Sequence, residues 1–132
     1  MSLIEDIKGT FVVVGSIGLS FHGIPKISKK QEIDIVTVDI NLLTNINSFG
    51  EVIEVDIQDR SPFGEQQRFT VTTPSNFLIE IFIQDTLPGY IEIDGIKIIS
   101  RPAAITHYKR LAQNTAVTNT QKFQRYLEQL VA

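Results

Sequence analysis

The chain has 132 residues, of which 42% are hydrophobic, enough for one globular domain with a real core. It carries 12 basic and 15 acidic residues, so its net charge of −3 excludes the global basic balance that drives strong nonspecific nucleic-acid binding. Cysteine is absent, which excludes disulfides and thiolate metal sites. The start, MSLIEDIKG, does not resemble a signal peptide, and no apolar run approaches the ~20 residues that span a bilayer. We therefore expect a single cytoplasmic domain over residues 1–132, without a membrane segment.

The first third of the chain predicts a helix, a strand, a helix and a strand. An amphipathic lead-in helix over residues 3–7 is followed by the apolar strand 11–14. Ser16 then has the side chain of an N-cap, which predicts a short helix ending near Gly23. A loop leads from there to a second strand over residues 32–39.

The remainder of the chain predicts one helix, several strands and two closing helices. A strong hairpin signal is the Asp94-Gly95 pair between two alternating segments. The expected helices are residues 41–48 and two within 102–131, and the expected strands are 52–57, 68–72, 77–83, 91–93 and 96–98. The two closing helices are expected to pack on the sheet through Ala104, Ile105, Tyr108, Phe123, Tyr126, Leu127 and Leu130.

This order of elements is not the regular strand–helix alternation of a doubly wound sheet. It favours an α+β fold, in which helices lie mainly on one face of a mixed sheet.

Two acidic residues stand out on the second strand. Glu32 and Asp34 are two positions apart, so they share one face and lie roughly 7 Å apart along the strand. Two carboxylates on one face can hold a hard divalent metal. The same pattern is also common on a strand whose outer face is simply solvated, so alone it does not decide between the two interpretations.

Three short motifs together resemble the signature of the nucleotidyltransferase superfold. They are Gly15-Ser16 after the first strand, His22-Gly23-Ile24-Pro25-Lys26 after the short helix, and Glu32-Ile33-Asp34 on the next strand. The middle motif is most similar to small bacterial proteins related to the nucleotidyltransferase toxins of type IV toxin–antitoxin systems. Several features depart from the family pattern. Glu32 stands where Asp is usual, Lys26 stands where Arg is usual, and the last helix lacks both acids that relatives often carry there.

The resemblance implies a metal site with a third carboxylate, for which the sequence offers two candidates. Glu80 has Leu78 and Phe82 as its same-face neighbours, and a carboxylate in such company is costly unless it is paired or binds a metal. Asp56 shares its face with Glu54, and solvation explains both. We favour Glu80 and keep Asp56 as the alternative.

The resemblance also implies an activity. Glu32, Asp34 and Glu80 would be the catalytic and metal-binding residues, with Mg²⁺ or Mn²⁺ as cofactor. Gly15, Ser16, Lys26 and Lys109 would bind the nucleotide. The protein would transfer a nucleoside monophosphate from a nucleoside triphosphate to an unknown acceptor hydroxyl, on a protein, an RNA or a small molecule. The alternative is a degenerate module, of antitoxin or regulatory type, that binds a nucleotide or a protein partner without turnover.

Overall fold

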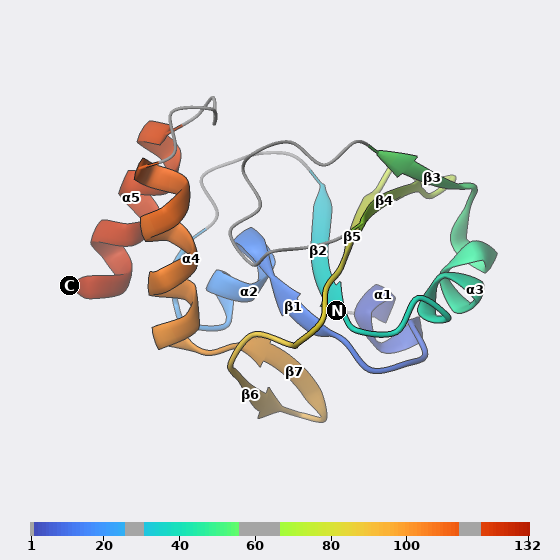
Figure 1. Ribbon diagram of the computed structural model, residues 1–132, viewed down its shortest axis with the longest axis horizontal. Helices are drawn as coiled ribbons and strands as arrows, with labels where there is room; N and C mark the ends of the chain where they lie inside the picture. Colours follow the sequence, from blue (N-terminus) through green and yellow to red (C-terminus); the bar gives the residue numbers. More distant parts are fainter. Residues whose placement is uncertain (1, 26–30, 56–66, 114–119) are drawn as a thin grey trace.

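The computed structural model describes residues 2–25, 31–55, 67–113 and 120–132, in which one seven-stranded mixed sheet is combined with helices (Figure 1). The helices are α1 (Ser2–Asp6), α2 (Gly15–Ser20), α3 (Leu42–Ile46), the 3-10 helix η1 (Asn47–Phe49), α4 (Arg101–Gln113) and α5 (Thr120–Val131). The strands are β1 (Val12–Val14), β2 (Glu32–Thr37), β3 (Val52–Val55), β4 (Gln67–Thr72), β5 (Leu78–Ile83), β6 (Tyr90–Ile93) and β7 (Ile96–Ile99). The α+β class and the mixed sheet expected from the sequence are confirmed.

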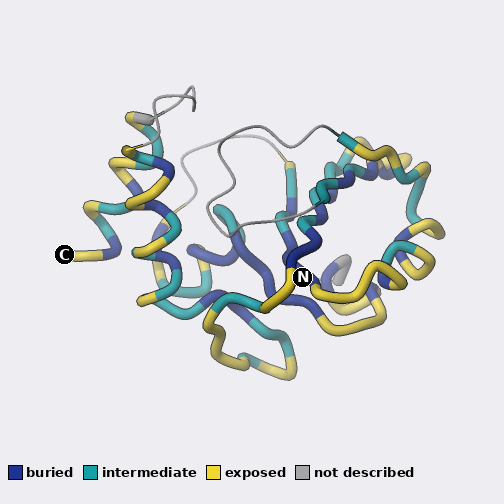
Figure 2. Tube along the Cα trace, viewed as in Figure 1, coloured by how far each residue is buried: buried dark blue, intermediate teal, exposed yellow. Residues whose placement is uncertain are grey.

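The strand order is β3-β4-β5-β2-β1-β7-β6, which places β2 at the centre. Strand β2 runs parallel to β5 and antiparallel to β1, and β1 runs parallel to β7. The outer pairs β3–β4, β4–β5 and β6–β7 are antiparallel. In the tube coloured by burial, the central strands β1, β2 and β5 contain only buried and intermediate residues (Figure 2). The second and fifth strands of the sequence therefore meet in the middle of the sheet.

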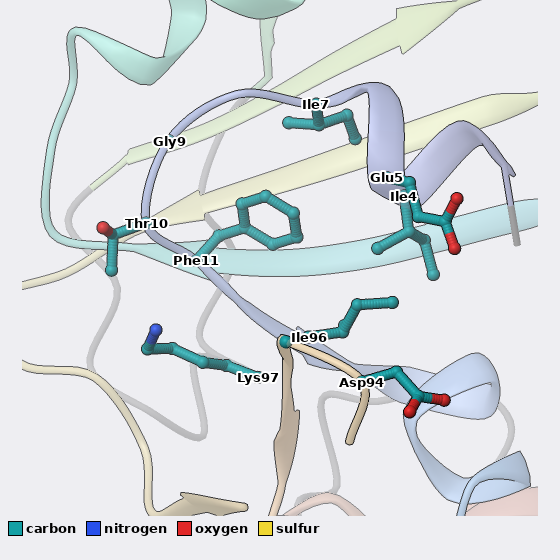
Figure 3. Close-up of a pocket in the computed structure, with 10 residues that line it drawn as sticks. Ile4, Glu5, Ile7, Gly9, Thr10, Phe11, Asp94, Ile96 and Lys97 are labelled. Carbon is teal, nitrogen blue, oxygen red and sulfur yellow. The ribbon is translucent and has the colours of Figure 1, made fainter. Parts of the chain in front are cut away.

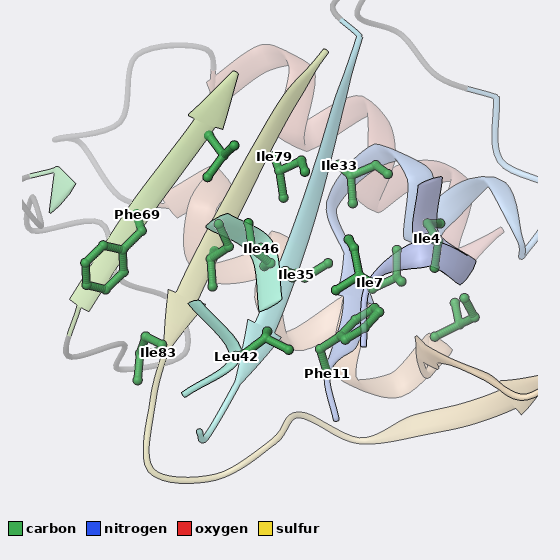
Figure 4. Packing of buried hydrophobic residues seen from close by; sticks show 14 residues of the cluster. Ile4, Ile7, Phe11, Ile33, Ile35, Leu42, Ile46, Phe69, Ile79 and Ile83 are labelled. Carbon is green, nitrogen blue, oxygen red and sulfur yellow. The ribbon is translucent and has the colours of Figure 1, made fainter. Parts of the chain in front are cut away.

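One face of the sheet is covered by α1 and α3. Inward side chains of β2 and β5, such as Ile33, Ile35 and Ile79, pack there against Ile4 of α1 and Leu42 of α3 (Figure 4). We expected helices mainly on one face, and this needs a correction. Alternate residues of β2 and β5 are apolar on the face that α1 and α3 cover, as others are on the opposite face. Both faces of the sheet therefore have to be covered by helices.

The opposite face is covered by α2, α4 and α5. The buried residues here include Val14 of β1, Val36 of β2 and Ile99 of β7. All seven residues predicted to pack the closing helices belong to this cluster, either buried or partly buried: Ala104, Ile105, Tyr108, Phe123, Tyr126, Leu127 and Leu130. Arg101 Nη1 also donates a hydrogen bond to the Leu130 carbonyl oxygen over 2.7 Å, which joins the start of α4 to the end of α5.

Several predicted boundaries shift. Strand β2 ends at Thr37 rather than Asp39, and the helix expected over residues 41–48 divides into α3 and η1. Ser16 is not the N-cap of α2, because the helix begins at Gly15 and its N-cap is Val14. The Asp94-Gly95 hairpin is confirmed. Both residues have positive φ, 52° and 81°, the combination that a two-residue type I′ turn requires.

Candidate metal centre

Three carboxylates converge on the face that α2, α4 and α5 cover. Asp34 of β2 lies directly opposite Glu80 of β5 in the parallel pair, and Glu32 is two residues before Asp34 on the same face. One carboxylate oxygen from each of the three side chains lies within 4.8 Å of the others. The predicted triad is therefore brought together, although its members come from strands far apart in the sequence.

The backbone of Gly15 closes one side of the cluster. Asp34 is paired with Val14, the last residue of β1, so the chain turns into α2 next to the Asp34 carboxylate. Gly15 has φ +67°, and a Cβ built on it would lie 2.1 Å from Asp34 Oδ2. Any side chain at this position would collide with the carboxylate. The Gly-Ser pair of the sequence motif thus has a local reason, since glycine permits both the turn and the close approach.

The surroundings of Asp34 disfavour a negative charge on its carboxylate. Its Oδ1 atom is buried and has no hydrogen-bond partner among the described residues. Burial, a hydrogen bond with Glu80 and the negative charges of Glu80 and Glu32 raise the pKa of Asp34 well above its ordinary value, and Arg68 opposes this. A bound cation would reduce the repulsion between the carboxylates and would give Asp34 Oδ1 a partner.

These observations fit a hard divalent cation such as Mg²⁺ or Mn²⁺. All the donors are carboxylate oxygens, the ligand type that these ions prefer. Asp34 Oδ1 supplies a buried acceptor that no described protein group uses. Glu32 and Asp34 are the residues that would hold the ion, and an oxygen of Glu80 lies within 4.8 Å of theirs.

The sequence did not reveal the partner of Glu80. Arg68 of β4 donates through Nη2 to Glu80 Oε1 over 2.5 Å, and its guanidinium carbon lies 5.6 Å from the centre of the Phe82 ring. Thr70 lies opposite Glu80, so Arg68 is its diagonal neighbour on the adjacent antiparallel strand. The turn after Thr72 fixes the register of β4 against β5. Counting residues back from this turn along β4 was the signal that could have identified Arg68 as the partner.

Helix α4 brings Tyr108 to the same region. Tyr108 is 3% exposed, and burial raises the pKa of its hydroxyl, with smaller contributions from the negative charges of Asp34, Tyr126 and Glu32. Its neighbour His107 packs edge to face against the Tyr108 ring, with the ring centres 4.8 Å apart. Burial, together with the charge of Arg110, lowers the pKa of His107 to about 3. Tyr108 was predicted to be a core residue, and its proximity to the acids was missed.

The other predicted site residues have mixed positions. Ser16 is half-exposed in the first turn of α2, beside Gly15. Lys109 lies on α4 with an exposed side chain, and no described contact joins it to the carboxylates. Lys26 and the alternative third acid, Asp56, lie outside the described residues. His22 of the middle motif has Nε2 at 2.7 Å from the Ile99 carbonyl oxygen, which makes it a structural link between the segment after α2 and β7.

A pocket of about 270 Å³ lies elsewhere, between α1 and the β6–β7 hairpin (Figure 3). Its walls include Ile7, Phe11 and Ile96, with Glu5 and Lys97 among the charged side chains. Ile7 and Phe11 belong to the core on the face of the sheet opposite the carboxylates. This pocket is therefore separate from the acidic cluster.

The fold and the centre define an α+β protein with a three-carboxylate site on its central strands. Comparison with protein-family models, curated proteins and solved structures finds no match. In the described part of the chain, none of the helices has the length and apolar character needed to cross a membrane. The geometry of the centre and the sequence motifs are therefore the features that indicate a function.

Proposed function

We propose that this protein is a metal-dependent nucleotidyltransferase, which transfers a nucleoside monophosphate from a nucleoside triphosphate to an acceptor hydroxyl. The observation that carries the proposal is the convergence of Glu32, Asp34 and Glu80 within 4.8 Å. The backbone of Gly15 lies next to the Asp34 carboxylate, where a side chain would collide with it. The order Gly-Ser, helix, acidic-apolar-acidic strand supports the same conclusion.

Each residue has a role in this proposal. Glu32 and Asp34 bind a divalent cation, which when bound neutralises phosphate charge at the reacting centre. Gly15 and Ser16 position the outer phosphates of the triphosphate, with Lys26 and Lys109 as further phosphate contacts. Glu80 orients the acceptor hydroxyl and accepts its proton. Positioning and charge neutralisation supply most of the rate enhancement in such transfers.

One observation favours the second candidate function, a module that binds a nucleotide or a protein partner without turnover. Glu80 already forms a short ion pair with Arg68, and a carboxylate engaged in this way is a weaker proton acceptor. In this case the acidic centre would still bind a cation and a nucleotide, but no transfer would follow.

A binding and labelling experiment separates the two functions. The melting temperature is measured with Mn²⁺ or Mg²⁺, alone and with each of the four nucleoside triphosphates, and transfer is followed with α-phosphate-labelled nucleotide. An active enzyme gains stability with the metal and labels an acceptor, whereas a binding module gains stability without labelling. The gain should follow mass action, about 2.7 kcal/mol at a concentration 100 times the dissociation constant.

The matched variants are Asp34→Asn and Asp94→Asn. Both remove one negative charge, but Asp94 lies in the exposed β6–β7 turn, where its positive φ of 52° also suits asparagine. Asp34→Asn should lose the metal-dependent gain, and Asp94→Asn should keep it. A wild-type protein that shows no shift with either metal would exclude both functions as stated.

A further inference from the structure

The ion pair between Arg68 and Glu80 places a fixed positive charge inside the acidic centre. Arg68 Nη2 lies 2.5 Å from Glu80 Oε1, and the two side chains are only 19% and 15% exposed. Solvent screens such partly buried charges much less than it screens charges on an open surface.

The position of Arg68 is maintained by more than its bond to Glu80. Its guanidinium lies over the Phe82 ring, with 5.6 Å between the guanidinium carbon and the ring centre. Arg68 and Phe82 are directly paired across β4 and β5, so the backbone register fixes this contact. Arg68 Nε is buried and has no hydrogen-bond partner in the described part of the chain.

We infer that Arg68 occupies the second cation position of the centre, so that the protein itself binds one divalent ion and not two. Once a bound cation displaces the proton shared by Asp34 and Glu80, three carboxylates and one guanidinium would leave two negative charges, which a single divalent cation would neutralise. A second divalent ion at Glu80 would meet the Arg68 charge at close range. The ion is held by Glu32 and Asp34, and Arg68 positions Glu80. This inference rests on the proposed function only in its use of a divalent cation at this centre.

The test is a Mn²⁺ titration of the full chain without nucleotide, with bound and free ion counted by electron paramagnetic resonance. Wild type should bind one Mn²⁺. Arg68→Gln should bind the first ion about tenfold more tightly or better, and should acquire a second site, because a repelling charge is gone. Arg68→Lys keeps the charge and should keep one site. Lys97→Gln is the matched control, since it removes a positive charge from the pair with Glu92 in the distant hairpin and should change nothing.

One further variant covers the case in which Arg68→Gln does not fold. Arg68→Gln combined with Glu80→Gln removes both charges of the ion pair at once and should still bind one ion, at Glu32 and Asp34. Two ions on wild type would overturn the inference and leave the proposed function intact. Unchanged affinity and stoichiometry in a folded Arg68→Gln variant, or loss of the ion in the double variant, would do the same. No binding to wild type would overturn the proposed function and this inference together.

Discussion

Asp34 and Glu80 lie directly opposite each other on the parallel strands β2 and β5, and their carboxyls share a hydrogen bond. Such a bond needs a proton, because two ionised carboxylates repel each other at this distance. The centre can therefore relieve its negative charge in two ways, by holding a proton or by binding a cation. Arg68 compensates the charge of Glu80 from the other side, and the pKa of Asp34 is raised.

The raised pKa of Asp34 predicts that the metal-free protein loses stability as the pH rises. Between the ordinary value of 3.8 and the raised pKa, the folded state binds more protons at Asp34 than the unfolded state. The contribution of Asp34 to the free energy of unfolding therefore falls as the pH rises through this window. Asp34→Asn should remove that slope and should be at least as stable as wild type at pH 7. Urea unfolding in the presence of a chelator, from pH 4 to pH 8, measures both.

His107 predicts the opposite slope on the acidic side. Its pKa of about 3 in the folded protein lies below the ordinary 6.5, so the unfolded state binds more protons between these values. Stability should fall as the pH falls from about 6.5 towards 3. The windows of His107 and Asp34 overlap, so the slope is best measured in the Asp34→Asn background. His107→Gln should flatten it there, and a slope that stays would show that His107 is not its source.

The packing of α5 predicts a sharp contrast between two neighbouring residues. Leu130 is 2% exposed and belongs to the cluster beneath α4 and α5, whereas Val131 is 59% exposed. Leu130→Ala should lower the free energy of unfolding by about 2–5 kcal/mol, because it leaves a cavity. Val131→Ala should stay within about 0.5 kcal/mol. Equal effects in denaturant melts would contradict the assigned buried face of α5.

Sequence patterns predicted the elements better than their arrangement. Alternation identified β2 and β5, and the Asp94-Gly95 pair identified its hairpin, because these signals depend only on neighbouring residues. The strand order depends instead on residues far apart in the sequence, since β1 lies between β2 and β7. Periodicity also shows that a side chain is buried without showing what covers it. The helices α1 and α3 were predicted, but their position on the second face of the sheet was missed for that reason.

The candidate site shows the same division. The shared face of Glu32 and Asp34 follows from strand geometry, and the apolar neighbours of Glu80 correctly indicated a carboxylate that needs a partner. The identity of that partner required the register of β4 against β5, which is fixed by the turn between them. Tyr108 required the placement of a helix that begins more than sixty residues after Asp34. Local patterns carry no information on this placement.

Gly15 provides the last prediction, because its two constraints can be separated. Gly15 and Gly23 both have positive φ, +67° and +80°, which costs a residue with a side chain about 1–2 kcal/mol. A Cβ at Gly23 meets nothing within 4 Å, whereas a Cβ at Gly15 would lie 2.1 Å from Asp34 Oδ2.

Gly23→Ala should therefore show the backbone cost alone, and it should keep the stabilisation by Mn²⁺. Gly15→Ala should lose more stability and should also lose the response to Mn²⁺, because the Asp34 carboxylate has to move. Denaturant melts and Mn²⁺ titrations of the two variants measure both effects. If Gly15→Ala kept wild-type affinity for the ion, the close approach of the Gly15 backbone to Asp34 would have no part in forming the centre.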